Sequence, residues 1–117
     1  MAIHVLEDDP GVSDSLALLL GDMGFEVFCH HDAEHFFRNP PPASSDIVLV
    51  DLALPGITGA EVIRWLQRLK DPPRIVAMSG QSQAVIDAEL RGIGITQVMR
   101  KPLNQAAIAA HLARLSN

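Results

Sequence analysis

Aromatic residues and cysteines are scarce in this 117-residue chain, which has four Phe, one Trp, no Tyr and a single cysteine, Cys29. A single cysteine excludes an intramolecular disulfide and is typical of a reducing compartment. Positive charge is also scarce, because the chain has nine Lys and Arg residues against fourteen Asp and Glu residues, which gives a formal net charge of -5. Without a basic block, the chain is not expected to bind nucleic acid directly by itself.

Long apolar runs are missing as well, since no segment approaches the roughly 20 residues that cross a membrane. The first residues lack the basic start and apolar stretch of a signal peptide, because Glu7, Asp8 and Asp9 follow closely on Met1. We therefore expect a cytoplasmic protein that does not enter the membrane. With 48% hydrophobic residues and the length of one ordinary domain, residues 1–117 can bury a core without disulfide bonds.

Five apolar segments of strand length alternate along the chain with five segments of helical periodicity. The clearest strand is 47–51, in which four apolar residues run into Asp51 before a Pro55-Gly56 turn. Such an unbroken apolar run predicts a strand buried on both faces. The other expected strands are 3–6, 25–29, 74–78 and 96–99, the second of them toward the sheet edge. The expected helices are 10–23, a short one through Phe36 and Phe37, one from 58 or 59 to 69, 83–91, and one after Asn104.

Residues at the ends of these helices support the assignment. Asp9 before Pro10 predicts an N-cap, as do Asp32 and Asn104, and Gly24 predicts the end of the first helix. The inner face of the last helix is expected to carry Ile108, Leu112 and Leu115. Alternating strands and helices predict an α/β fold: one doubly wound, five-stranded parallel sheet of flavodoxin-like order 2-1-3-4-5, with helices on both faces.

Four of the expected strands end at polar residues: Glu7 with Asp8, then Asp51, Ser79 and Lys101. The carboxyl ends of parallel strands form the edge where α/β sheets bind ligands. Two carboxylates roughly 4 Å apart repel by about 4 kcal/mol at an effective dielectric of about 20, so three of them require a proton or a cation. Mg²⁺ suits such oxygen ligands. An Asp nucleophile, Mg²⁺, a Lys and a hydroxyl are the parts that phosphoryl transfer needs.

Over nearly its whole length the chain resembles a response-regulator receiver domain. The segments that carry the resemblance are Glu7-Asp8-Asp9, Asp51 with Pro55-Gly56 and Thr58-Gly59 after it, Ser79-Gly80 and Lys101-Pro102. The resemblance implies that Asp51 is the phosphoacceptor and that Glu7 and Asp8 hold Mg²⁺ together with Asp51. It also implies that the Ala53 backbone carbonyl contacts the metal, that Ser79 is the switch hydroxyl and that Lys101 binds the phosphoryl group.

The same resemblance implies partners and an output. The phosphoryl donor would be a sensor histidine kinase or a histidine phosphotransfer protein, and phosphorylation would switch protein contacts, with a homodimer as one outcome. Such a domain catalyses its own phosphorylation and dephosphorylation and turns over no small substrate. Residues 3–9 and 14–19 are similar to those of receivers that precede a LuxR-type helix-turn-helix domain in transcription regulators. The chain is then either a stand-alone receiver or one excised from a longer regulator.

Two positions depart from the receiver pattern. Val98 stands three residues before Lys101, where the family usually has Tyr or Phe. Ala53 lies two residues after Asp51, at a position that in the family influences dephosphorylation, and its side chain makes no polar contact. The sequence therefore does not determine how phosphorylation of Asp51 is transmitted to the rest of the domain. It also does not determine the lifetime of the phosphorylated form.

Two other functions are compatible with parts of the pattern. A small Mg²⁺-dependent phosphatase with an Asp nucleophile usually carries a second acid where this chain has Ala53. A receiver-like binding module could signal without phosphorylation, which Val98 allows. His30, His31 and His35 have no recognisable metal-ligand spacing and are expected to form a solvated cluster. Cys29 is expected to be a small buried hydrophobe.

Overall fold

The structure, a computed structural model, describes residues 1–95 and 97–116, and its described side chains end at residue 114. Thr96, expected at the start of the fifth strand, and the side chain of Leu115 lie outside the described residues. The strands are β1 (Ala2–Leu6), β2 (Glu26–His30), β3 (Ile47–Asp51), β4 (Arg74–Ser79) and β5 (Val98–Arg100). The helices are α1 (Pro10–Asp22), α2 (Ala33–Phe37), α3 (Gly59–Gln67), α4 (Gln83–Glu89) and α5 (Gln105–Ser116).

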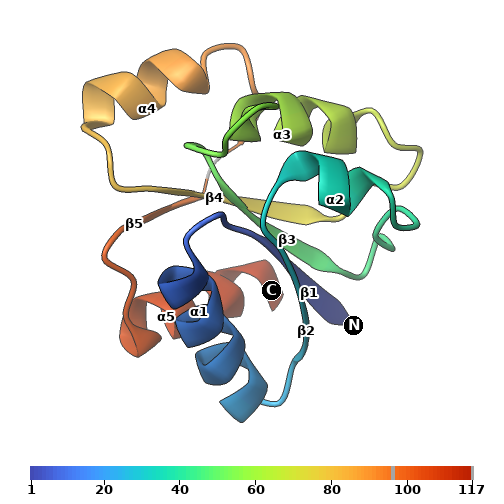
Figure 1. Cartoon of the computed structure of the whole chain (residues 1–117), viewed down its shortest axis with the longest axis vertical. Helices are drawn as coiled ribbons and strands as arrows, with labels where there is room; N and C mark the ends of the chain where they lie inside the picture. The colour runs from blue at the N-terminus through green and yellow to red at the C-terminus, as the bar shows by residue number, and fades with distance from the viewer. Residues whose placement is uncertain (96, 117) are drawn as a thin grey trace.

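The five strands form one parallel sheet in the order β2-β1-β3-β4-β5, as expected. Figure 1 shows α1 and α5 together on one face of the sheet and α2, α3 and α4 on the other. β3 is the central strand and all five of its residues are buried. The unbroken apolar run of this strand is thus explained by helices on both faces.

Two apolar clusters fill the space between the sheet and its two layers of helices. On one face, Val48 and Val50 of β3 pack with α2, α3 and α4 through residues such as Val62 and Ile86. On the other face, Ile47 and Leu49 pack with α1 and α5. Because successive side chains of a strand point to opposite faces, one short strand contributes to both clusters.

The capping residues act as the sequence predicts. The Asp9 carboxylate accepts hydrogen bonds from the N–H groups of Gly11 (2.9 Å) and Val12 (3.4 Å). The Asp32 carboxylate accepts from His35 N–H (2.7 Å), and the Asn104 side-chain oxygen accepts from Ala107 N–H (2.8 Å). These bonds satisfy first-turn N–H groups that have no partner inside their helices. Within the described part of the chain, no helix has the length and apolar content needed to cross a membrane.

Three details differ from the expectations. Helix α4 ends at Glu89, before the expected end at residue 91, and its buried residue is Ile86. Cys29 is exposed and not buried, because β2 is an edge strand. His30 is buried and not solvated, because its side chain points to the opposite face, where α2 covers it.

Candidate functional site: an acidic cluster with a lysine

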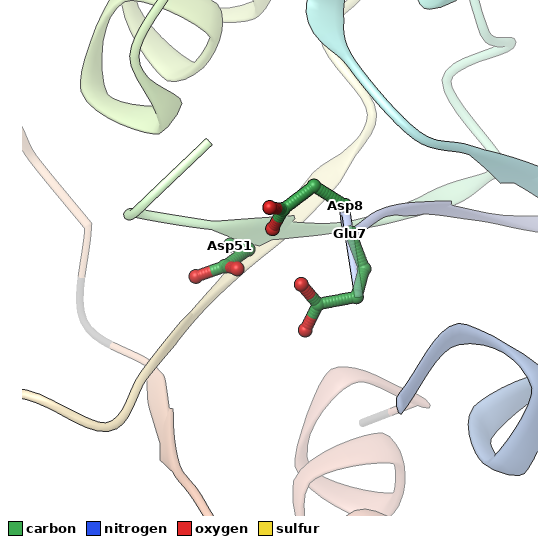
Figure 2. Close-up of side chains that lie close together, drawn as sticks. All are labelled: Glu7, Asp8 and Asp51. Atoms are coloured by element: carbon green, nitrogen blue, oxygen red, sulfur yellow. The ribbon is translucent and has the colours of Figure 1, made fainter. Parts of the chain in front are cut away.

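Three carboxylates meet at the carboxyl ends of the two central strands. Glu7 and Asp8 follow β1, and Asp51 is the last residue of β3. Each of the three can offer an oxygen within 4.8 Å of the others, and Figure 2 shows their carboxylates turned toward a common space. Glu7 and Asp51 are buried, with 1% and 3% of their surface exposed, whereas Asp8 is exposed. The cluster therefore has two acids fixed in the sheet edge and one at the solvent side.

Main-chain bonds fix the two buried acids. The N–H of Glu7 donates to the carbonyl of His30 at 3.0 Å, which ties the end of β1 to the end of β2. Asp51 lies opposite Met78, and the next residue, Leu52, donates to the Met78 carbonyl at 2.9 Å. The Asp51 Oδ1 atom also accepts from the N–H of Ala53 at 3.0 Å. Asp51 is thus held in the sheet on one side and in the following turn on the other.

Lys101 reaches this cluster from the end of β5. Its Nζ donates to Glu7 Oε1 and to Asp51 Oδ2, the latter at 3.1 Å. Its backbone N–H donates to the carbonyl of Ser79 at 2.9 Å, which aligns the ends of β4 and β5. Glu7 and Asp51 therefore share the Lys101 ammonium group, although they lie 94 and 50 positions from Lys101 in the sequence.

Ser79 is buried at the end of β4. Its Oγ accepts a hydrogen bond from Gln81 N–H at 3.0 Å, so the hydroxyl can still donate its own proton. Ala53 is exposed, and its side chain offers no polar atom to a molecule that approaches Asp51. Val98 is half-buried and packs against the apolar cluster on the α2, α3 and α4 face.

The cluster contains more negative than positive charge, and the pKa values of Glu7 and Lys101 are both raised. Burial and the neighbouring Asp51 carboxylate raise the pKa of Glu7 to about 7, although Lys101 partly opposes them. Burial alone would lower the pKa of Lys101, but its bonds to Glu7 and Asp51 outweigh burial and raise it. One ammonium group thus faces two buried carboxylates and a third at the surface. An additional cation would relieve their repulsion.

The donor set fits a hard divalent cation. All three side chains offer carboxylate oxygens, which Mg²⁺ prefers, and the exposed Asp8 leaves a solvent side where a hydrated ion can keep its waters. The raised pKa of Glu7 supports this, because the cluster lacks positive charge. The arrangement therefore brings the buried Asp51 carboxylate together with two further acids and an ammonium group, and Ser79 ends the neighbouring strand β4.

Gly59 is needed where α3 begins beside the Asp51 turn. A Cβ atom on Gly59, the first residue of α3, would lie 2.3 Å from the Asp51 carbonyl oxygen and 2.8 Å from Leu52 Cα. Only a residue without a side chain allows α3 to begin so close to the backbone of the Asp51 turn. The Thr58-Gly59 pair in the sequence carried this signal, but it is visible only once the turn and the helix are in contact.

Comparisons with known proteins agree with this geometry. The chain is 30% identical over 110 residues to the transcriptional regulatory protein FixJ of Azorhizobium caulinodans, covering 94% of this chain and 52% of that protein. It is 31% identical over 114 residues to the cell cycle response regulator CtrA of Brucella ovis, covering 96% of this chain and 48% of that protein. The chain thus spans about half the length of these curated relatives.

Solved structures show the same fold. The FixJ-N crystal structure superposes with a TM-score of 0.84 at 28% identity and covers 98% of this chain and 92% of that chain. The chemotaxis protein CheY4 of Vibrio cholerae superposes with a TM-score of 0.82 at 24% identity over 97% of this chain and 98% of that chain. The profile described as response regulator receiver domain matches residues 3–113, and the chain therefore belongs to the response regulator receiver domain family.

Proposed function

We propose that this chain is a cytoplasmic phosphoacceptor receiver in which Asp51 takes a phosphoryl group from a phosphohistidine donor. Glu7, Asp8 and Asp51 would hold Mg²⁺, with the Ala53 backbone carbonyl as a further ligand. The observation that carries this proposal is the convergence of the three carboxylates with Lys101 at one sheet edge. Membership of the receiver family supports it.

The transfer uses groups that are already in place. An Asp51 oxygen attacks phosphorus, the P–N bond to the donor imidazole breaks, and the ring leaves with that electron pair. Bound Mg²⁺ would supply positive charge against the phosphoryl oxygens. Lys101 Nζ donates to Asp51 Oδ2 and can pair with the negative charge of the phosphoryl group. The Ser79 hydroxyl can donate a hydrogen bond to a phosphoryl oxygen. The gain of charge at Asp51 would bias an existing equilibrium between two forms of the domain.

The direct test is phosphorylation by acetyl phosphate. Incubation with Mg²⁺ should add one phosphoryl group to the wild type, seen by intact mass, and Asp51→Asn should not be labelled. Asp14→Asn removes an exposed acid of α1 and is the matched control, which should be labelled normally. A wild type that stays unmodified here and with a kinase would refute the proposal and favour a binding module that signals without phosphorylation. Multiple-turnover phosphate release from phosphomonoesters would instead reveal a phosphatase.

A groove beside the site suits the phosphohistidine donor, either a sensor histidine kinase or a histidine phosphotransfer protein. It has a volume of about 670 Å³ between α1 and the segment after β5, and Lys101 is shared by the groove and the acidic cluster. Its walls include Val12, Leu16 and Leu103. We expect an apolar helix face of the donor to lie there, because this brings its histidine to Asp51.

A charge in the groove should separate donor docking from chemistry. Ser15 is exposed and lines the groove, so Ser15→Arg should slow transfer from a donor protein and leave labelling by acetyl phosphate unchanged. Asp22→Arg lies on the same helix outside the groove lining and should change neither reaction. If a donor protein transfers its phosphoryl group to the wild type and to Ser15→Arg at equal rates, the groove is not the docking site of the donor.

The output of the domain is proposed from its relatives. FixJ is named a transcriptional regulatory protein and CtrA a cell cycle response regulator, so we propose that this receiver controls transcription, through a LuxR-type domain in the same protein or as a stand-alone partner. The coding sequence around residues 1–117 decides between these forms.

A homodimer is a further proposed consequence of phosphorylation. Ala84, Val85 and Ala88 expose apolar surface on α4, and Val85 is 39% exposed. Analytical ultracentrifugation should show a larger species only after phosphorylation, and Val85→Glu should weaken it.

A further inference from the structure

Residues 80–83, which lead from β4 into the first residue of α4, have no apolar packing of their own. All four are exposed, and Ile86 is the buried residue of the helix that follows. Hydrogen bonds must therefore hold this turn, because an exposed segment with few apolar contacts opens easily. Ser79 at the end of β4 depends on the turn, since its buried Oγ accepts from Gln81 N–H at 3.0 Å.

Arg100, the last residue of β5, holds the turn with two hydrogen bonds. Its Nη2 donates to the carbonyl of Gln81 at 2.8 Å, and its Nη1 donates to Gln83 Oε1 at 2.9 Å. A charged donor makes such bonds stronger than those between neutral groups. The Gln83 side chain is held at its other end as well, because its Nε2 donates to Asp87 Oδ1 at 2.8 Å. One guanidinium group thus joins β5 to both the turn and the start of α4.

The strand register places Arg100 beside the residue that the turn holds. Ser79 and Arg100 are partners in the pairing of β4 with β5, one position after Met78 and Met99. Both methionines lie in the apolar cluster on the α1 and α5 side of the sheet. Because successive side chains alternate between faces, Ser79 and Arg100 point to the other face, where Figure 1 shows α4. The two side chains thus meet the same turn from neighbouring strands.

Gln81 connects the two contacts, because its carbonyl accepts from Arg100 and its N–H donates to Ser79 Oγ. We infer that Arg100 is a positioning residue for the Ser79 hydroxyl, an inference that rests on the proposed phosphorylation of Asp51. The guanidinium group fixes the Gln81 backbone, and the Gln81 N–H then holds Ser79 Oγ and leaves the hydroxyl proton for a phosphoryl oxygen. Arg100 acts through Gln81 and not by contact with the phosphoryl group.

Charge alone would give Arg100 a different role. A cation next to Lys101 would attract a phosphoryl group without any help from the turn. Arg100→Lys separates the two roles, because lysine keeps the charge but lacks the planar fork that spans Gln81 and Gln83. Arg91→Met is the control for loss of charge, since it removes an exposed cation beyond the end of α4.

Amide hydrogen exchange in the unphosphorylated protein tests the positioning step without any chemistry at Asp51. Arg100→Met, Arg100→Lys and Ser79→Ala should each raise the exchange rate of the Gln81 amide about tenfold, and Arg91→Met should leave it unchanged. The amides of β3 should exchange as in the wild type. An unchanged Gln81 rate in Arg100→Met contradicts the inference. A rise shared by the β3 amides also contradicts it, because the variant then loosens the whole fold.

The rate at which acetyl phosphate and Mg²⁺ label Asp51 tests the consequence for the reaction. Arg100→Met and Arg100→Lys should each slow labelling about three- to tenfold, and Arg91→Met should label as the wild type does. In a Ser79→Ala background neither Arg100 variant should slow labelling further, because the hydroxyl that they position is gone.

The outcomes separate this role of Arg100 from the proposed function. If Arg100→Lys labels like the wild type, or if Arg100→Met slows labelling equally with and without Ser79, the positioning role is wrong and Asp51 remains the phosphoacceptor. A wild type that is not labelled refutes the proposed function and, with it, this role of Arg100.

Discussion

Glu7 and Asp51 compete for one ammonium group, and this is the central electrostatic fact of the site. Lys101 Nζ contacts both carboxylates, while Asp8 adds a third acid at the solvent side. The three acids and one base leave a deficit of positive charge whenever all of them are ionised. A proton on Glu7 or a divalent cation can each supply part of it, so the two compete for the same site.

The raised pKa of Glu7 leads to a prediction on metal affinity. With a pKa of about 7, Glu7 holds a proton in the metal-free protein at lower pH, and Mg²⁺ must displace that proton to bind. Mg²⁺ affinity should therefore rise with pH up to about 7, by at most about tenfold per pH unit, and level off above it. Calorimetric titration with Mg²⁺ at a series of pH values measures this dependence.

Glu7→Gln is the control for this competition. It removes the titrating group and keeps an oxygen, so its affinity should be weaker than that of the wild type but nearly independent of pH over the same range. An affinity for Mg²⁺ that is flat in the wild type from pH 5 to 7 would contradict the assignment of the proton to Glu7.

At the scale of elements, the start of α3 depends on Gly59. Its missing side chain lets the first turn of the helix contact the backbone of Asp51 and Leu52. Gly59→Ala would place a Cβ 2.3 Å from the Asp51 carbonyl oxygen, so helix and turn must separate. We expect this substitution to lower the free energy of unfolding by about 1–3 kcal/mol, measured by urea denaturation, and to slow labelling of Asp51.

Gly21 in α1 is the matched control. A Cβ there meets no atom within 4 Å, so Gly21→Ala gains helix propensity without a clash. It should raise stability by about 0.5–1 kcal/mol and leave labelling unchanged. If both glycine variants lose stability equally, backbone contact is not the reason for Gly59.

Local sequence patterns predict those elements whose burial or contacts depend on neighbouring residues. β3 was predicted with its bounds, because a strand buried on both faces is apolar throughout. The caps at Asp9, Asp32 and Asn104 were also predicted, because a cap is a contact between residues two or three positions apart. The positions of the acids and Lys101 at one edge followed from the parallel order of the strands.

The predicted burial of Cys29 and the predicted solvation of His30 are wrong, because both depend on which helix covers which side of an edge strand. Cys29 and His30 are neighbours on β2, yet the first is exposed and the second buried. The sequence shows that their side chains point to opposite faces of the strand, but it does not show which face a helix covers. Likewise, the contact of Gly59 with Asp51 and the sharing of Lys101 between Glu7 and Asp51 are long-range and have no local signature.

The β2–α2 contact should respond to acid through His30. Burial and the nearby His35, His4 and His31 lower the pKa of His30 from 6.5 to about 4. The unfolded chain therefore takes up the proton first, and the stability linked to this group is complete above pH 6.5 and falls as the pH drops toward 4. The loss should be roughly 3 kcal/mol, measured as urea-unfolding free energy against pH.

Two variants isolate this effect. His30→Phe keeps an aromatic ring in the buried position and should remove most of the loss between pH 6.5 and 4. His31→Phe alters an exposed ring and should keep the wild-type dependence. A steep acid loss that remains in His30→Phe would assign it to other groups.

At the scale of the whole molecule, the acidic cluster joins the ends of three strands. Glu7 follows β1, Asp51 ends β3 and Lys101 follows β5, so ordering this cluster restrains the middle and one edge of the sheet together. A cation that binds only when these strands are assembled must stabilise the entire fold. The repulsion among the acids, which weakens the metal-free sheet edge, is thereby relieved.

Mg²⁺ should therefore raise the unfolding temperature of the whole domain in a single cooperative transition. At a concentration of about 100 times its Kd the gain is about 2.7 kcal/mol, because the ion binds the folded state alone. Asp8→Ala removes the exposed ligand and leaves the two buried acids in place, so its metal-free stability should stay close to the wild-type value while the Mg²⁺ effect disappears. Differential scanning calorimetry with Mg²⁺ and with an equal ionic strength of NaCl distinguishes site binding from screening. An equal rise with NaCl, or an undiminished Mg²⁺ effect in Asp8→Ala, would show that the three carboxylates do not act as one metal site.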